Sequence, residues 1–179
     1  MNKKKKLIII TAIVLCIVLV CFYRYEKINK NVAKAYEKQE YQIGENVDLD
    51  NLKLVVKSYE LVQHNKVDNA DVLLQLNIKN ISEKTIDAST LIDNSKLATE
   101  FQYQDYADIK KEDFNHIKNL KPKDELNFQL RYSVLPGVIN NSKNKNEFKF
   151  YIANKLYKNE ITKKYEDLKL YSKYVYLKS

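Results

Sequence analysis

Residues 126–134 read Leu-Asn-Phe-Gln-Leu-Arg-Tyr-Ser-Val, so every second side chain is apolar or aromatic and every intervening one is polar. Successive side chains of a β-strand point to opposite faces, and this period of two therefore predicts a strand with one buried and one solvated face. Residues 72–79, Val-Leu-Leu-Gln-Leu-Asn-Ile-Lys, place aliphatic side chains at every second position in the same way. Both stretches indicate a β-protein.

Weaker alternation extends to three further stretches, residues 52–61, 148–152 and 168–176. The first slips phase near Val55, as a bulged strand does. In the last, the pattern assigns four residues to the buried face: Leu168, Leu170, Tyr174 and Tyr176. Five strands are thus predicted, joined by segments rich in Asn, Asp and Lys.

Two connecting segments have their own signals. Residues 105–118 fit a strand poorly and favour a turn or two of helix with Tyr106, Ile109 and Phe114 facing inward. Pro136-Gly137 is the strongest turn dipeptide of the chain.

Strands that are apolar on one side must cover that side, and two sheets packed face to face do so for about 140 residues. A closed barrel is the alternative, but barrels usually rely on glycine at their corners, and the chain has only 2 Gly. The prediction is a mainly β fold, a β-sandwich. So few glycines also argue against phosphate-cradling and dinucleotide loops, and hence against a nucleotide enzyme.

The formal net charge of +8 lies mostly outside this predicted domain. Residues 1–38 hold nine basic against two acidic side chains, whereas residues 39–179 hold 22 against 21. A nearly neutral domain lacks the basic surface that nucleic-acid binding requires. We therefore expect no nucleic-acid partner.

Residues 7–23 contain no charge and follow four lysines. At 1.5 Å per residue they form about 26 Å of helix, close to the roughly 30 Å of a hydrocarbon core. Val20 precedes Cys21 and Leu15 precedes Cys16, where lipidation needs a small residue, and a usual cleavage site is missing. A retained single-pass anchor is predicted, with residues 1–6 as a cytoplasmic tail and the remaining chain outside the cell membrane.

Residues 24–40 lack Pro and Gly and place Tyr25, Ile28, Val32 and Tyr36 at spacings of three and four. This stripe predicts a short helical stalk that continues the membrane helix, or alternatively a docking helix for another membrane protein. The extracytoplasmic domain is then expected to span residues 41–179.

The order of these elements resembles the telokin-like, immunoglobulin-related extracellular domains of small Gram-positive lipoproteins and membrane-anchored proteins of unknown function. The resemblance rests on strand patterns and turns over about residues 41–137: Gly44-Glu45 opening a strand, residues 52–62, residues 72–80 followed by Ile-Ser-Glu-Lys, and Leu120-Lys-Pro before residues 126–134. Lys123 stands where the family has the glycine of Pro-Gly-Glu. The resemblance implies a β-sandwich outside the membrane and carries no catalytic residue.

Chemistry-bearing residues are sparse. His64 and His116 both lie in polar stretches, and no nucleophile motif accompanies an Asp/His/Ser arrangement around His116. Acidic pairs are ordinary loop acids in the simplest reading; the pairs are Asp68 with Asp71, Asp105 with Asp108, Glu112 with Asp113, and Asp124 with Glu125. We therefore predict no catalytic residue, no metal site and no cofactor, with residues 105–112 as the place to test calcium.

Tyrosine is abundant, with 14 Tyr and no Trp, and crowds the basic C-terminal third. If Leu168, Leu170, Tyr174 and Tyr176 are buried, Tyr171 faces outward beside Lys169 and Lys173. These three residues form the predicted interaction surface; the alternative is edge-strand lysines that prevent aggregation between sheets.

The leading functional prediction is a single-pass, membrane-anchored extracytoplasmic binding or accessory module that works through a protein partner at the cell surface. One alternative is an envelope hydrolase that uses paired carboxylates such as Asp105 and Asp108. The other is a structural spacer in contact with the wall.

Overall fold

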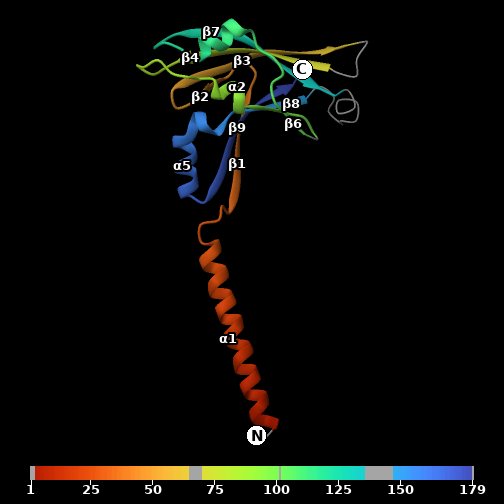
Figure 1. Ribbon diagram of the computed structural model, residues 1–179, viewed down its shortest axis with the longest axis vertical. Coiled ribbons are helices and arrows are strands. Elements are labelled where there is room, and N and C mark those ends of the chain that lie inside the picture. The colour runs from red at the N-terminus through yellow and green to blue at the C-terminus, as the bar shows by residue number, and fades with distance from the viewer. Residues whose placement is uncertain (1–2, 65–69, 101, 136–146, 179) are drawn as a thin grey trace.

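The structure is a computed structural model that describes residues 3–64, 70–100, 102–135 and 147–178. A long N-terminal helix, α1 (Lys3–Asn29), projects from a β-domain that contains the other described elements (Figure 1). The predicted turn at Pro136-Gly137 lies outside the described residues.

The domain is a sandwich of two sheets. Strand order in the five-stranded sheet is β1 (Ala35–Gln42), β9 (Lys169–Lys178), β8 (Glu147–Tyr151), β5 (Lys96–Ala98) and β6 (Tyr103–Gln104). The four-stranded sheet runs β2 (Asn46–Asp48), β3 (Leu52–Gln63), β4 (Ala70–Asn80) and β7 (Glu125–Val134). The predicted β-sandwich is confirmed.

The alternating apolar residues of the strands form the core between the two sheets. The apolar phase of β4 is fully buried, and in β7 Phe128, Leu130, Tyr132 and Val134 are at most 4% exposed. The phase slip predicted near Val55 appears as a register shift between Val56 and Ser58 in the β3–β4 pairing. A bulge keeps the apolar side chains inward on both sides of it.

Short helices fill the connections: α2 (Thr90–Asn94), α3 (Lys111–Ile117), the 3₁₀ turn η1 (Asn154–Tyr157) and α5 (Lys158–Glu166). Helix α3 confirms the helical prediction for residues 105–118. Tyr106, Ile109 and Phe114 are partly buried against the core, as predicted.

The predicted helical stalk is wrong beyond Asn29. Helix α1 covers Tyr25 and Ile28, but residues 35–42 form strand β1, which pairs in parallel with β9 from Ala35↔Lys169 to Gln42↔Tyr176. Local spacing favoured a helix, but pairing with β9 adds tertiary contacts to backbone hydrogen bonds along the whole strand, whereas a short helix without packing partners is marginal in water. The sandwich therefore begins at Ala35, not at residue 41.

Lys123 occupies a position in the turn before β7 where the backbone conformation favours glycine. Lys123 has φ 63°, the left-handed region that favours glycine. The Asp124 backbone N–H donates to the Lys121 carbonyl at 3.1 Å, closing a turn with Pro122 at its second position.

Tyr132 carries a buried hydroxyl without a hydrogen-bond partner among the described residues. Burial raises the pKa of Tyr132 far above its usual range. An unsatisfied buried hydroxyl costs roughly 1–3 kcal/mol, so Tyr132→Phe is expected to raise the free energy of unfolding by about 1 kcal/mol. Urea denaturation of both proteins measures this; a loss of stability in the variant would show that the hydroxyl is satisfied.

Candidate functional site

The outer face of the five-stranded sheet carries tyrosine side chains from four strands. They are Tyr36 of β1, Tyr174 and Tyr176 of β9, Tyr151 of β8 and Tyr103 of β6. The period of two along each strand and the pairings Glu40↔Tyr174 and Tyr151↔Tyr174 bring them onto one surface. We call these five residues the tyrosine face.

Contacts between tyrosine rings run across this face from β6 to β9. The rings of Tyr103 and Tyr151 meet edge to face with centroids 5.6 Å apart, and those of Tyr151 and Tyr174 are 5.2 Å apart. Tyr103 is 65% exposed and Tyr36 is 53% exposed, whereas Tyr174 is only 7% exposed. The face thus has a fixed aromatic floor with two exposed rings at its sides.

Glutamates hold two of the tyrosine hydroxyls. Tyr174 donates to Glu40, and the Tyr176 hydroxyl donates to Glu147 Oε2 at 2.5 Å. The bond from Tyr176 lowers the pKa of Glu147, and the same bond, together with burial, raises the pKa of Tyr176 to about 12. Both side chains keep their usual charge states at neutral pH and form a preorganised pair.

Lys149 lies among these rings, with Nζ 5.4 Å from the ring centroid of Tyr174 and 6.0 Å from that of Tyr176. A cation over an aromatic ring is attracted by about 0.5–1 kcal/mol at an exposed site. Its stem also covers apolar ring surface, so Lys149 stiffens the floor of the face.

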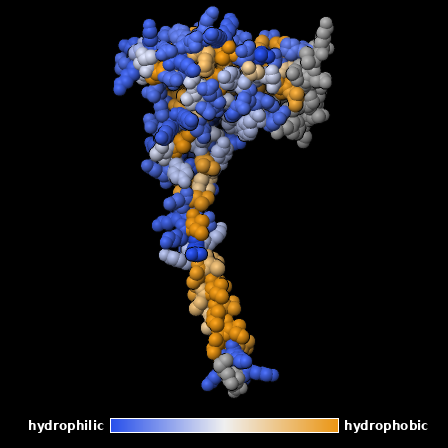
Figure 2. All heavy atoms as spheres, in the orientation of Figure 1, coloured by the Kyte–Doolittle hydropathy of each residue, from blue (hydrophilic) through white to orange (hydrophobic). Residues whose placement is uncertain are grey.

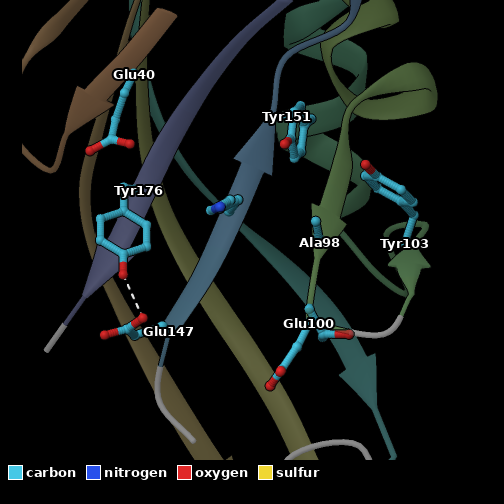
Figure 3. A pocket seen from close by; sticks show the side chains of 9 residues that line it. Glu40, Ala98, Glu100, Tyr103, Glu147, Tyr151 and Tyr176 are labelled. Atoms are coloured by element: carbon cyan, nitrogen blue, oxygen red, sulfur yellow. Dashed lines mark hydrogen bonds between the residues drawn. The ribbon is translucent and has the colours of Figure 1, made fainter. Parts of the chain in front are cut away.

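Two hollows open on the tyrosine face. The larger, of about 540 Å³, is lined by Tyr103, Tyr151, Tyr176 and the carboxylates Glu40, Glu100 and Glu147 (Figure 3). Lys149 also lines it. The smaller, of about 380 Å³, shares Tyr103 and Tyr151 and reaches Tyr36 and Ser172, which are joined by a 2.8 Å hydrogen bond. Aromatic walls with a few fixed polar groups suit contact with a partner side chain or another small group.

The predicted interaction surface of Lys169, Tyr171 and Lys173 is not exposed as expected. Tyr171 is 4% exposed and Lys173 is 3% exposed, while Leu170, assigned to the buried face, is 51% exposed. Strand β9 lies between β1 and β8, so the edge-protection alternative is also wrong. The alternation in residues 168–176 predicts the wrong buried face because α5 covers the end of β9 and buries polar side chains there.

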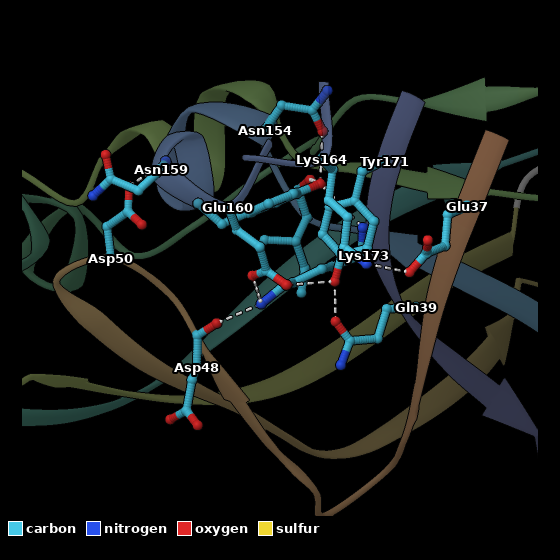
Figure 4. Close-up of polar contacts among 12 residues, drawn as sticks. Glu37, Gln39, Asp48, Asp50, Asn154, Asn159, Glu160, Lys164, Tyr171 and Lys173 are labelled. Atoms are coloured by element: carbon cyan, nitrogen blue, oxygen red, sulfur yellow. Dashed lines mark hydrogen bonds and ion pairs between the residues drawn. The ribbon is translucent and has the colours of Figure 1, made fainter. Parts of the chain in front are cut away.

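These residues instead join α5, β1, β2 and β9 through buried polar contacts (Figure 4). Lys173 Nζ lies 2.6 Å from Glu160 Oε2 and donates to the Asp48 carbonyl at 2.8 Å. The Tyr171 hydroxyl donates to Glu160 Oε1 at 2.8 Å and contacts Gln39.

The third predicted residue, Lys169, is half-buried and reaches Glu37 of β1 at 3.2 Å. Glu37 also receives Lys164 of α5 at 2.7 Å. All three predicted side chains thus make internal contacts that hold the sandwich end together.

Neither histidine forms a nucleophile arrangement within the described residues. Asp71 accepts from His64 at 3.0 Å and from the Ser133 hydroxyl at 2.9 Å. A triad needs the histidine between acid and serine, whereas here the acid is in the middle. His116 pairs with Asp124 at 2.6 Å.

In the predicted pair of Asp105 and Asp108, each carboxylate has its own basic partner. Asp105 contacts Lys96, whereas Asp108 lies 3.6 Å from Arg131. Across the described residues, no group of three or more His, Cys, Asp or Glu is placed to hold a metal ion. Asp68 lies outside the described residues.

Sequence patterns missed the tyrosine face because it assembles from strands far apart in the chain. Strands β1 and β6 were not predicted, and Tyr174 and Tyr176 were assigned to the core. The only available signal was the tyrosine content itself, together with the alternation at residues 148–152.

No residue of helix α1 is buried, and its stretch 7–23, which carries no charge, is largely hydrophobic on the face seen in Figure 2. It is the one helix among the described residues that is long and apolar enough to cross a membrane. The chain therefore combines a β-sandwich with an N-terminal apolar helix that could anchor it to a membrane.

No family model and no curated protein matches this chain. Among solved structures, an uncharacterised β-sandwich protein of Clostridium difficile is similar at 12% identity and a TM-score of 0.54, over 81% of this chain and 99% of the other. A functionally unknown Listeria monocytogenes protein is 14% identical, with a TM-score of 0.48 over 63% of this chain and 73% of its own. A candidate lipoprotein of Staphylococcus aureus is 8% identical, with a TM-score of 0.45 over 63% and 80%.

The Clostridium difficile likeness shows the β-sandwich fold. The names of these structures do not include the telokin-like family, so that narrower resemblance stays a prediction.

Proposed function

We propose that this protein is a single-pass, membrane-anchored extracytoplasmic binding or accessory module of a Gram-positive cell, acting through contacts with a protein partner. The exposed apolar helix supports the anchor. The four lysines before residues 7–23 favour a cytoplasmic N-terminus, because adjacent positive charges resist translocation.

The observation that carries the binding role is the tyrosine face. Exposed Tyr103 and Tyr36 flank hollows whose polar groups are already fixed by Glu40, Glu147 and Ser172. Rigid aromatic side chains give large contact areas at low conformational-entropy cost, and tyrosine is enriched at protein interfaces. We place the partner contact here.

We propose that the protein binds its partner and does not catalyse hydrolysis. The carboxylates considered for hydrolysis face cations: Asp105 lies against Lys96 and Asp108 against Arg131. Each carboxylate is thus occupied by its own ion pair, whereas a general acid or base must reach the substrate.

The partner contact predicts a loss of capture when the exposed ring is removed. Tyr103→Ala is expected to reduce recovery of the partner after cross-linking of intact cells about tenfold or more, since an aromatic anchor contributes roughly 2 kcal/mol. The matched control is Ile81→Ala, which removes an apolar side chain that is 43% exposed outside the face. Equal losses in both variants, or none, would exclude the tyrosine face as the contact surface.

A further inference from the structure

The end of the sandwich next to α1 exposes apolar side chains that the core does not use. Ile28 is 73% exposed, Val32 52%, Tyr165 49% and Leu170 51%. They come from α1, the following loop, α5 and β9. Apolar and aromatic side chains of this kind, interspersed with lysine, are typical of the layer between water and hydrocarbon in a bilayer.

Hydrogen bonds fix α5 and β9 to the end of α1. The Tyr165 hydroxyl donates to the Asn31 carbonyl at 3.3 Å, and the Lys34 backbone N–H donates to the Leu168 carbonyl at 2.8 Å. The C-terminal end of α5 and the start of β9 therefore lie at the point where the chain leaves the helix (Figure 1).

Helix length places this junction in the head-group layer. If residues 7–23, about 26 Å of helix, are centred in a core of about 30 Å, the border of the core lies about 2 Å beyond Tyr23, and Asn29 lies about 7 Å beyond that border. The head-group layer of one leaflet is itself about 5–8 Å thick. The loop after α1, and the residues bonded to it, are thus level with the head groups.

This membrane-proximal rim, residues 24–37 and 163–170, has an excess of positive charge. It holds seven basic side chains against the acidic Glu26, Glu37, Glu166 and Asp167. Glu37 is already paired with Lys164 and Lys169. Among the described residues, Lys30, Lys34 and Lys163 make no ion pair and are exposed, so their charges are available to a ligand.

We propose that the membrane-proximal rim binds anionic phospholipid head groups of the bilayer that α1 spans. Lys30, Lys34 and Lys163 neutralise the phosphates, and Val32, Tyr165 and Leu170 lie in the interfacial layer. Each basic side chain near an anionic surface contributes about 1 kcal/mol. The inference rests on the membrane anchor of the proposed function but not on the tyrosine face.

A single tryptophan tests this, because the chain has none. Full-length Leu170→Trp is reconstituted into vesicles of phosphatidylcholine, alone or mixed with phosphatidylglycerol, each with a head-group-level quencher. We expect roughly twofold stronger quenching in the anionic vesicles and loss of that difference in a Lys30→Glu, Lys34→Glu, Lys163→Glu background. Leu135→Trp, directly after β7 of the four-stranded sheet and outside the rim, is expected to show no lipid dependence.

A matched charge change elsewhere is the control. Lys84→Glu, Lys110→Glu and Lys111→Glu alter three exposed lysines outside the rim and should leave the quenching of Trp at position 170 unchanged. Equal quenching in both lipids, or equal effects of the two triple changes, would overturn the inference. Vesicle flotation distinguishes a failure of the lipid-binding inference from a failure of the membrane anchor. A protein that does not float with either lipid contradicts the proposed function itself.

Discussion

Glu160→Ala is expected to lower the free energy of unfolding by about 3 kcal/mol or more, because it leaves a buried lysine charge without its partner. The Lys173 side chain is only 4% exposed, and its Nζ lies 2.6 Å from Glu160 Oε2. The Asp48 carbonyl remains as a neutral acceptor and limits the loss. Chemical denaturation of the two proteins measures the difference.

Lys173→Met is the matched control. It removes the buried charge while keeping a flexible side chain of similar length, and it leaves Glu160, whose side chain is 37% exposed, accessible to water. We expect a loss of about 1 kcal/mol, clearly smaller than that of Glu160→Ala. Equal losses would show that packing, and not the unpaired charge, determines stability at this site.

Protonation of Glu160 at low pH should reproduce the loss of stability expected for Glu160→Ala. Burial raises the pKa of Glu160, but hydrogen bonds from Lys173 and Tyr171 outweigh it and hold the pKa below 4.5. A lowered folded-state pKa contributes stability that is present above the unfolded value and is lost as the pH falls through the folded value. The stability difference between the wild type and Glu160→Ala should therefore shrink below about pH 4.

Removal of β1 is expected to prevent stable folding. A fragment of residues 43–179 loses the whole parallel pairing with β9, together with the Glu37 and Glu40 contacts. It also exposes the edge of β9, which invites association between chains. The combined loss is about 5 kcal/mol or more, comparable to the total stability of many domains.

The matched fragment, residues 31–179, keeps β1 and the Lys34 bond to Leu168. It is expected to fold as a monomer with the near-ultraviolet circular dichroism of ordered tyrosines, whereas residues 43–179 should lose this signal and aggregate in sedimentation experiments. Equal thermal stability of the two fragments would instead support a domain boundary near residue 41.

The sequence pattern predicted the sandwich because burial of one strand face leaves a period of two. Strands β3, β4 and β7, the bulge near Val56 and helix α3 all followed from local spacing. Strand β1 did not, because the spacing of Tyr25, Ile28, Val32 and Tyr36 also suits a helix. Its pairing with β9 bridges more than 130 residues, beyond the reach of any local pattern.

The candidate site depended even more on distant contacts. Tyr171 and Lys173 have the period of an exposed strand face, but α5 folds over them and supplies Glu160 as a partner. Alternation identifies which residues share a face but not which of two faces is covered. The tyrosine face became visible only once the strands of the five-stranded sheet were placed in order.

By itself, the amino-acid order determined the apolar helix at residues 7–23, the period-two strands and the scarcity of chemical motifs, since each is a property of neighbouring residues. Tertiary structure alone decided where the domain begins, which side of β9 is buried, and which tyrosines meet. Those outcomes depend on backbone pairing and burial between segments far apart in the chain, whose energies exceed local preferences.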